Sequence, residues 1–280
     1  MRQQTFINNK PTLYLVATPI GNMKEFTPRA IEILNDVALV GCEDTRTSKI
    51  LLDHFEIKTP LTSYHKFNEK EACAKFINIL NEGKDVALIS DAGYPLVSDP
   101  GSYLVEEVIN NGFNVTTISG SCAFLNALVA SNFSLERFTF VGFLESKSTA
   151  RKKELEGLKN NKETLIFYES PHRIEETLKD MLLIFKDREI VLARELTKKF
   201  EEYIRGTISE VLKDLSNVKG EIVLIVKGNC EEVKTISEEE LINEIEDLKK
   251  RKISNKEIVS LICDKYELKK NYVYNLVCKN

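Results

Sequence analysis

The stretch from Ile89 to Gly101 carries the densest set of residues that could hold a ligand. It reads I-S-D-A-G-Y-P-L-V-S-D-P-G and contains two Asp, two Gly, two Pro and two Ser. The apolar run before it predicts a buried strand, and the apolar spacing after it predicts a helix. A simple connection needs far less turn chemistry. Such loops hold cofactors in open α/β sheets, and Gly93 lets a ligand approach the main chain. The remaining alternative is a rigid connection that binds nothing.

Four other apolar runs also end on polar or glycine-containing segments. These segments are T-P-I-G-N (18–22), E-D-T-R (43–46), H-K-F-N-E (65–69) and S-G-S-C (119–122). Because the carboxyl ends of parallel strands meet at one edge of a sheet, we expect the five segments to converge on one crevice. None of them matches G-x-G-x-x-G or G-x-x-x-x-G-K-[ST], which disfavours a classical dinucleotide or phosphate-loop site.

The elements that position these segments alternate along the first half of the chain. Strands are predicted over residues 13–17, 38–42, 61–64, 85–89 and 115–118, with a helix after each. Strand–helix alternation is typical of a mainly parallel sheet with right-handed crossovers. We therefore expect an α/β domain over residues 1–132, with the join to the next domain near S-N-F-S-L-E-R (131–137).

The second half predicts an α/β domain of another kind, over residues 133–229. Strands are predicted over 138–143, 164–168, 190–193, 200–205 and 222–226, and helices over 148–160, from Pro171 and over 208–215. The consecutive strands near its end predict a mixed sheet. Residues 230–280 change in composition and predict three short helices, at about 237–250, 254–266 and 268–277. Tyr272 and Tyr274 near lysines suggest an RNA-contacting face. A small helical appendage with a solvated face is the alternative.

Composition limits the class of protein. Hydrophobic residues make up 42% of the 280 residues, which is enough for real cores, and the formal net charge of −4 argues against a protein that coats nucleic acid uniformly. The six cysteines have no metal-ligand spacing with the three histidines, so we expect reduced thiols, no metal and a cytoplasmic location. The polar start does not resemble a signal peptide, and no apolar run approaches the roughly 20 residues of a membrane span.

The motifs, in this order, resemble those of the tetrapyrrole-methylase superfamily. Within it they are similar to the branch that methylates the ribose 2′-hydroxyl of a cytidine in 16S ribosomal RNA. The resemblance covers roughly residues 13–228 and rests on T-P-I-G-N, E-D-T-R, D-A-G-Y-P-L-V-S-D-P-G (91–101), F-Y-E-S-P-H-R (167–173), A-R-E-L-T-K (193–198) and G-E-I-V-L-I-V-K-G (220–228). It implies a two-domain fold with a helical C-terminal extension, a homodimer, and the small ribosomal subunit or a late precursor as partner.

The resemblance also implies roles for particular residues. S-adenosylmethionine is the implied cofactor, and the residues expected to bind it are Pro19, Asp91, Ala92, Gly93, Ser119, Gly120, Ser121, Cys122, Ala123, Leu196 and Ile222. The residues expected to contact RNA are Arg46, Arg151, Lys152, Lys153, His172, Arg173, Arg194 and Lys198. The chain departs from the usual family pattern at four positions, namely Phe67, Tyr94, Ser119 and Ser121, where the family has histidine, threonine and two prolines.

Methyl transfer from a sulfonium is an in-line displacement in which positioning does most of the catalysis. The ribose hydroxyl must lose a proton, and Glu43, Asp44 and His65 are the candidates for the general base. E-D-T-R has an alternative interpretation as a salt-bridged helix cap, because Asp and Thr are ordinary capping residues. Two other functions stay open: a methylase of a compact, porphyrin-like molecule, and a non-catalytic module that senses the cofactor.

Overall fold

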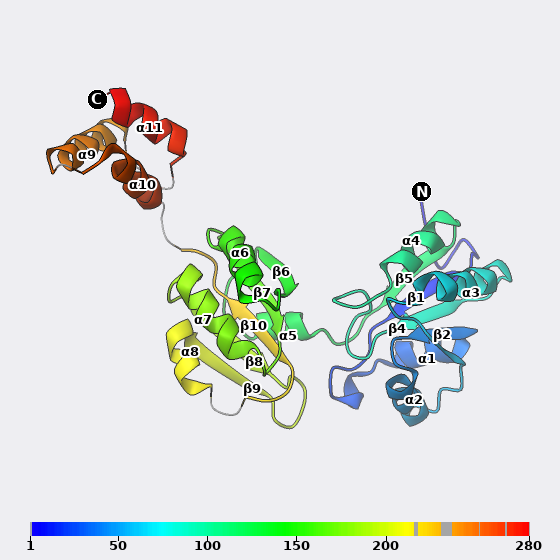
Figure 1. The fold of residues 1–280 in the computed structure, drawn as a ribbon. Helices are drawn as coiled ribbons and strands as arrows, with labels where there is room; N and C mark the ends of the chain where they lie inside the picture. The colour runs from blue at the N-terminus through cyan, green and yellow to red at the C-terminus, as the bar shows by residue number, and fades with distance from the viewer. Residues whose placement is uncertain (1, 216–217, 231–236, 252, 267, 280) are drawn as a thin grey trace. The chain divides into compact units, whose positions relative to one another are not determined.

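A computed structural model describes residues 2–215, 218–230, 237–251, 253–266 and 268–279. The chain divides into two compact units, residues 1–229 and residues 230–280. Unit 1 contains two five-stranded sheets, and unit 2 is helical (Figure 1). No helix in the described ranges is long and apolar enough to cross a membrane.

The first sheet is parallel throughout and has the strand order β3-β2-β4-β1-β5. Its strands are β1 (Thr12–Val16), β2 (Leu39–Cys42), β3 (Leu61–Ser63), β4 (Val86–Ile89) and β5 (Asn114–Ile118). Its helices are η1 (Met23–Glu25), α1 (Pro28–Asp36), α2 (Thr45–His54), α3 (Glu69–Asn81) and α4 (Ser102–Asn110). The predicted parallel sheet is therefore confirmed.

Alternation along the strands explains why helices cover both faces of this sheet. In β1, Tyr14 and Val16 join the core made with α1 and α2, while Leu13 and Leu15 join the core made with α3 and α4. Successive strand residues point to opposite faces, so a continuously apolar strand requires cover on both sides. The loops at the carboxyl ends of the strands are left free at one edge of the sheet.

The second sheet is mixed, as predicted, with the order β6-β7-β10-β8-β9. Only the β6–β7 pair is parallel. Its strands are β6 (Phe138–Phe143), β7 (Thr164–Glu169), β8 (Glu189–Arg194), β9 (Glu202–Thr207) and β10 (Ile222–Val226). The strand predicted from residue 200 begins later because β9 pairs with β8 from Arg194↔Glu202 to Glu189↔Thr207.

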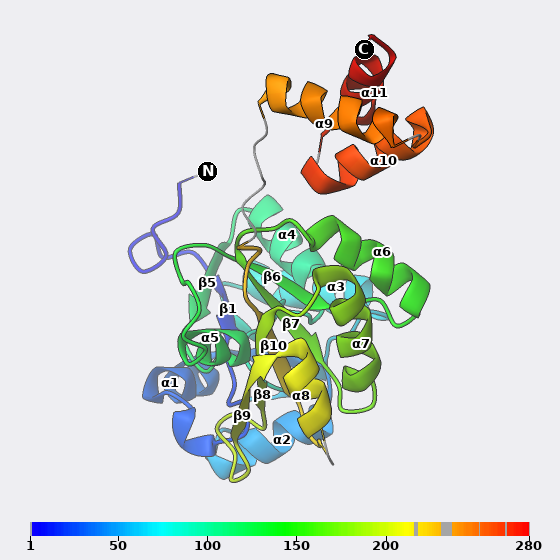
Figure 2. The same cartoon turned by 90° about the vertical axis from the view of Figure 1, so that its left-hand side faces the viewer.

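Helices α6 (Ser148–Leu158), α7 (Ile174–Phe185) and α8 (Ile208–Asp214) pack on one face of this sheet (Figure 2). Helix α5 (Ala123–Val129) packs on the other face, where Ala127 and Leu128 meet Val191 and Val223. Helix α7 was predicted to begin at Pro171. It begins at Ile174 because the carbonyl of Ser170 accepts hydrogen bonds from both Arg173 and Ile174, which closes a turn first.

Unit 2 consists of α9 (Glu238–Lys250), α10 (Asn255–Tyr266) and α11 (Lys270–Lys279) around a core of its own. These are the three helices predicted from the apolar spacing. A capping box at Ser237 and Glu240 begins α9, because each side chain satisfies a backbone N–H of the other residue. Leu241, Ile245, Ile258 and Val273 are among the buried residues that hold the helices together.

The basic helix α6 differs from its prediction at one position. Arg151 was expected on the surface, but its side chain is only 1% exposed and lies 2.7 Å from the carboxylate of Asp180 on α7. Ser148 and Lys152 also bind Asp180. Arg151 therefore joins two helices and does not contact RNA from this position, whereas Lys153 is exposed.

Replacing Asp180 with Ala should destabilise unit 1 by about 3–5 kcal/mol, because it removes the buried carboxylate that pairs with Arg151 and leaves only the exposed Glu176 carboxylate, 3.8 Å away. Urea unfolding of the whole chain measures this loss. The matched control is Glu175→Ala, which breaks the exposed ion pair with Lys179 on the same helix and should cost at most about 1 kcal/mol. Equal effects of the two substitutions would contradict a structural role for the buried pair.

Candidate active site

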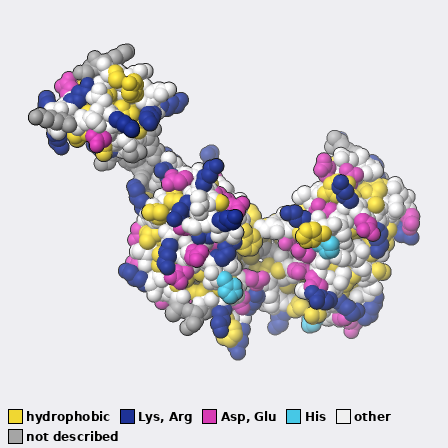
Figure 3. Space-filling model, in the orientation of Figure 1, with side chains coloured by type: hydrophobic (Ala, Val, Ile, Leu, Met, Phe, Trp, Pro, Cys, Tyr) yellow, Lys and Arg dark blue, Asp and Glu magenta, His cyan; other side chains and the backbone are white. Residues whose placement is uncertain are grey.

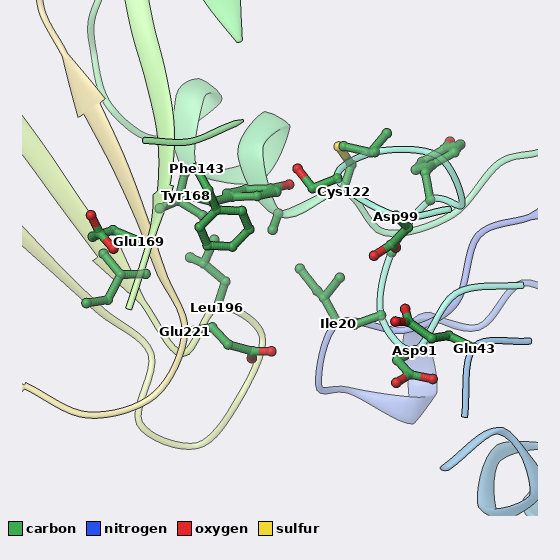
Figure 4. A pocket seen from close by; sticks show the side chains of 18 residues that line it. Ile20, Glu43, Asp91, Asp99, Cys122, Phe143, Tyr168, Glu169, Leu196 and Glu221 are labelled. Atoms are coloured by element: carbon green, nitrogen blue, oxygen red, sulfur yellow. The ribbon is translucent and has the colours of Figure 1, made fainter. Parts of the chain in front are cut away.

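A cavity of about 340 Å³ lies between the loops of the two sheets in unit 1. One wall carries Glu43, Asp91 and Asp99, and the opposite wall carries Tyr168 and Leu196 (Figure 4). Cavities of this size are typical of sites for small molecules and cofactors. Four of the five segments expected to converge, all but H-K-F-N-E (65–69), contribute residues to this cavity, and the second sheet supplies residues of the opposite wall.

The loop after β4 is fixed to the end of β1 by the main chain. Thr18 N–H donates to the Gly93 carbonyl at 2.9 Å, and Gly93 N–H donates to the Thr18 carbonyl at 3.1 Å. The Ser90 hydroxyl also donates to the Gly93 carbonyl, at 3.0 Å. Gly93 has φ +80°, a conformation that L-residues with a side chain rarely adopt. The glycine is thus required by the backbone turn itself.

Backbone strain is concentrated on both sides of this cavity. Leu96 and Ser98 in the loop after β4 have φ of 71° and 67°, and Glu195 and Thr197 in the loop after β8 have φ of 50° and 68°. These are four of the eight non-glycine residues with positive φ in the described part of the chain. Such conformations persist where the surrounding structure enforces them, and they gather at ligand sites.

Five acidic residues line the cavity, Glu43, Asp91, Asp99, Glu169 and Glu221, and the first three lie on one wall. Asp99 is half-buried, and burial together with the neighbouring Glu43 and Asp91 carboxylates raises its pKa to about 6. A ligand that carries positive charge would relieve this repulsion. Sequence reasoning included Asp91 but missed Asp99, although the second Asp of the same loop was a visible signal. It also missed the aromatic wall of Phe143 and Tyr168.

The E-D-T-R segment divides its residues between two roles. Asp44 is the N-cap of α2, accepting a hydrogen bond from Arg46 N–H, and its carboxylate also holds the Arg46 guanidinium at 2.7 Å. These hydrogen bonds lower the pKa of Asp44 to about 2. The predicted salt-bridged cap is therefore present at Asp44. Glu43 instead faces the cavity.

A second, more open cavity of about 530 Å³ adjoins the first one. Glu43 and Asp91 line both cavities, and the second is completed by residues from the ends of β2 and β3. These further residues are Asp44, Thr45, Arg46, Ser63, His65 and Phe67. The Nδ1 atom of His65 is buried and has no hydrogen-bond partner in the described structure. The three residues predicted as general-base candidates are thus brought together here.

The predicted cofactor-binding residues separate into two groups. Asp91, Ala92, Gly93, Cys122, Ala123, Leu196 and Ile222 line the first cavity. Pro19 lines a neighbouring cavity, together with Lys198.

Ser119, Gly120 and Ser121 do not line the first cavity. Gly120 N–H donates to the Tyr94 hydroxyl at 3.2 Å, and the Ser121 hydroxyl donates to Glu25 at 2.7 Å. The turn that lacks its usual prolines is held in this way by Tyr94 and Ser121, two of the residues that depart from the family pattern.

Most cations proposed to contact RNA already have acidic or carbonyl partners. Arg173 donates to the Leu144 carbonyl at 2.7 Å, Arg194 pairs with Glu202, and Lys198 pairs with Glu195 and Glu221. His172 is exposed. On the face seen in Figure 3, Lys and Arg are interspersed with Asp and Glu. Among described residues, no group of three or more His, Cys, Asp or Glu is arranged to hold a metal ion.

Replacing Asp99 with Asn should stabilise the protein at pH 8. The native pKa of about 6 lies above the ordinary value of 3.8, so the folded chain holds a proton that the unfolded chain releases. The contribution of Asp99 to stability therefore falls as pH rises between these values. Melting temperatures at pH 8 and pH 4 measure the gain, which should be largest at pH 8. Asp53→Asn, on the exposed side of α2, is the control. An equal gain at both pH values would contradict the prediction.

The sequence of this chain is similar to a known protein family and to named bacterial proteins. The family model of tetrapyrrole (corrin/porphyrin) methylases matches residues 12–212. The chain is 48% identical to "Ribosomal RNA small subunit methyltransferase I" of Bacillus subtilis, over 83% of this chain and 82% of the relative. It is 43% identical to the protein of that name in Haemophilus influenzae, over 94% of each chain.

Solved structures share the fold at low identity. A cobalt precorrin-4 methyltransferase superposes with a TM-score of 0.58 at 15% identity, covering 77% of this chain and 94% of its own. The methyltransferase CobJ gives a TM-score of 0.58 at 17% identity, covering 81% and 97%. With the family model matching most of unit 1 and these relatives covering most of the chain, the protein belongs to the tetrapyrrole (corrin/porphyrin) methylases and, within them, to the family of ribosomal RNA small subunit methyltransferase I.

Proposed function

We propose that this chain transfers a methyl group from S-adenosylmethionine to the ribose 2′-hydroxyl of a cytidine in 16S ribosomal RNA. The observation that supports it best is the pair of adjoining cavities that share Glu43 and Asp91. The first cavity is the less open of the two and is lined by carboxylates, as suits a cationic cofactor. The other is open and lies at the surface, as suits a nucleotide of a large RNA.

The residues of the first cavity fit the cofactor. Glu43, Asp91 and Asp99 offer negative charge, and Gly93, Leu196 and Ile222 bring main chain close to the cavity. When bound, S-adenosylmethionine supplies a methyl group on a positively charged sulfur, which makes the methyl reactive without a metal. The protein's task is then to orient the hydroxyl and to take its proton.

Glu43 is the best-placed general base, because it lines both cavities. Asp44 is less suited, because its cap and its ion pair with Arg46 hold its pKa at about 2, and an acid this strong accepts protons poorly. His65 lies in the open cavity and could serve as an alternative base. Arg46, with 89% of its side chain exposed, is placed to meet a phosphate.

We also propose that the protein forms a homodimer. The exposed apolar residues Leu125 and Val129 of α5 neighbour the edge strand β6, where Phe138 is also exposed and its ring lies 6.5 Å from that of Phe124. An apolar patch beside an edge strand supports a homodimer.

RNA contact by unit 2 is supported by the exposed Tyr272 and Tyr274 on α11. We also propose that unit 1 consists of two domains, which join between residues 132 and 133. A ribosomal substrate would place the enzyme in the cytoplasm.

The product identifies the reaction, because a 2′-O-methylated ribose resists alkaline cleavage. Small subunits from cells that lack this protein should gain alkaline resistance at one cytidine when incubated with the protein and S-adenosylmethionine. Glu43→Gln should lower kcat by roughly 10²- to 10⁴-fold, as expected for loss of a general base. Asp44→Asn, which preserves a good N-cap, should retain most activity.

The reverse order of these two effects would make Asp44 the base. Methylation of a base nitrogen or carbon, or of a small molecule alone, would contradict the proposed function. Cofactor binding, measured by calorimetry on both variants, separates loss of chemistry from loss of the site.

A further inference from the structure

Phe67 is an aromatic side chain that the fold leaves almost fully in water. It is 95% exposed, more than any other large hydrophobic residue in the described ranges. Burying a Phe side chain is worth about 1.5–3 kcal/mol, so an exposed ring contributes little to folding. Phe67 lines the same open cavity as the general-base candidates Glu43, Asp44 and His65, so a role in that cavity can account for its exposure.

The turn that presents Phe67 is well ordered by hydrogen bonds. Asn68 N–H donates to the His65 carbonyl at 3.0 Å, and the Asn68 side chain accepts from His65 N–H at 2.8 Å. The same side chain donates to the Ser63 carbonyl at 3.0 Å. The turn is therefore anchored to the end of β3, and the exposed ring is held out by a pre-organised backbone.

Two of the other four exposed phenylalanines in the described ranges, Phe6 and Phe200, are covered by a cation, and Phe67 is not. Arg29 lies 5.3 Å from the ring centroid of Phe6, and Lys199 lies 5.6 Å from that of Phe200. Within the described part of the chain, no Lys or Arg stacks on Phe67 in this way. Its recorded ring contact is with His65, edge-on at 6.1 Å between centroids. A face of the ring is thus available.

The surroundings of Phe67 match the chemistry of a nucleotide. The open cavity that it lines also contains the exposed guanidinium of Arg46 and the carboxylate of Glu43. An aromatic face can stack on a base, a guanidinium can meet a phosphate, and a carboxylate can face a ribose hydroxyl. These three groups occur together on one surface of unit 1.

We propose that Phe67 stacks on the cytosine base of the target nucleotide and so holds its ribose over Glu43. This inference rests on the proposed function and adds a residue that positions the bound nucleotide. Stacking of one base on an aromatic side chain is worth about 5- to 100-fold in affinity. Bases must leave their own stack to reach an active site, and an aromatic partner replaces what they lose.

The absence of tryptophan from the sequence allows a direct test. Phe67→Trp introduces the chain's sole indole at the proposed stacking position, and Phe6→Trp introduces one at another exposed phenylalanine. Addition of small subunits from cells that lack this protein should quench the fluorescence of the first variant and not that of the second. Phe67→Ala should raise KM for the subunits about 5- to 100-fold while the calorimetric affinity for S-adenosylmethionine stays unchanged.

The two variants together decide the proposal. Quenching at position 67 with a raised KM for Phe67→Ala, restored in Phe67→Trp, supports it. Unchanged KM, or a raised KM without quenching, overturns it, because the ring would then not contact a base. Wild-type protein methylates the subunits in the same assay if the proposed function holds, so failure of that function is seen separately.

Discussion

The mutual backbone hydrogen bonds between Thr18 and Gly93 are the constraint on which the site depends. They join the ends of two adjacent parallel strands, β1 and β4, beyond the last residues of the sheet itself. The loop after β4 then has to turn away, and it does so through residues with positive φ, including Leu96 and Ser98. This geometry brings Asp91 and Asp99 to the same cavity as Glu43 from the end of β2.

The resulting cluster of carboxylates is unfavourable in the protein alone. Burial and the two neighbouring charges raise the pKa of Asp99 to about 6, so the free site is electrostatically strained. Under the proposed function, a positively charged cofactor bound here would convert this repulsion into attraction. In contrast, Asp44 one residue away is satisfied by the helix and by Arg46. Adjacent acids in one motif thus have opposite roles.

The fold could be predicted well because its signals are local. Apolar runs followed by Gly, Pro and Asp indicated the strands of the first sheet, and consecutive strands indicated the mixed sheet. Side-chain partners distant in sequence could not be predicted. Arg151 stands in R-K-K and looked like a surface cation, but its side chain is buried and pairs with Asp180 on the next helix. Tyr94 stood out in the sequence only because the family usually has threonine there, but its hydroxyl accepts a hydrogen bond from Gly120 N–H. The sequence motifs located the candidate site, but the tertiary contacts determine which residues of each motif face a cavity and which are held in structural contacts.

Under the proposed function, the carboxylates of the first cavity recognise the positive charge of the cofactor. Calorimetry with S-adenosylmethionine and with S-adenosylhomocysteine, which lacks the sulfonium charge, tests it most directly on the wild-type chain and on Asp91→Asn. We expect the substitution to weaken binding of the charged ligand about 10-fold more than binding of the neutral one, as expected for one partly buried charge interaction. Equal weakening of both ligands would contradict it.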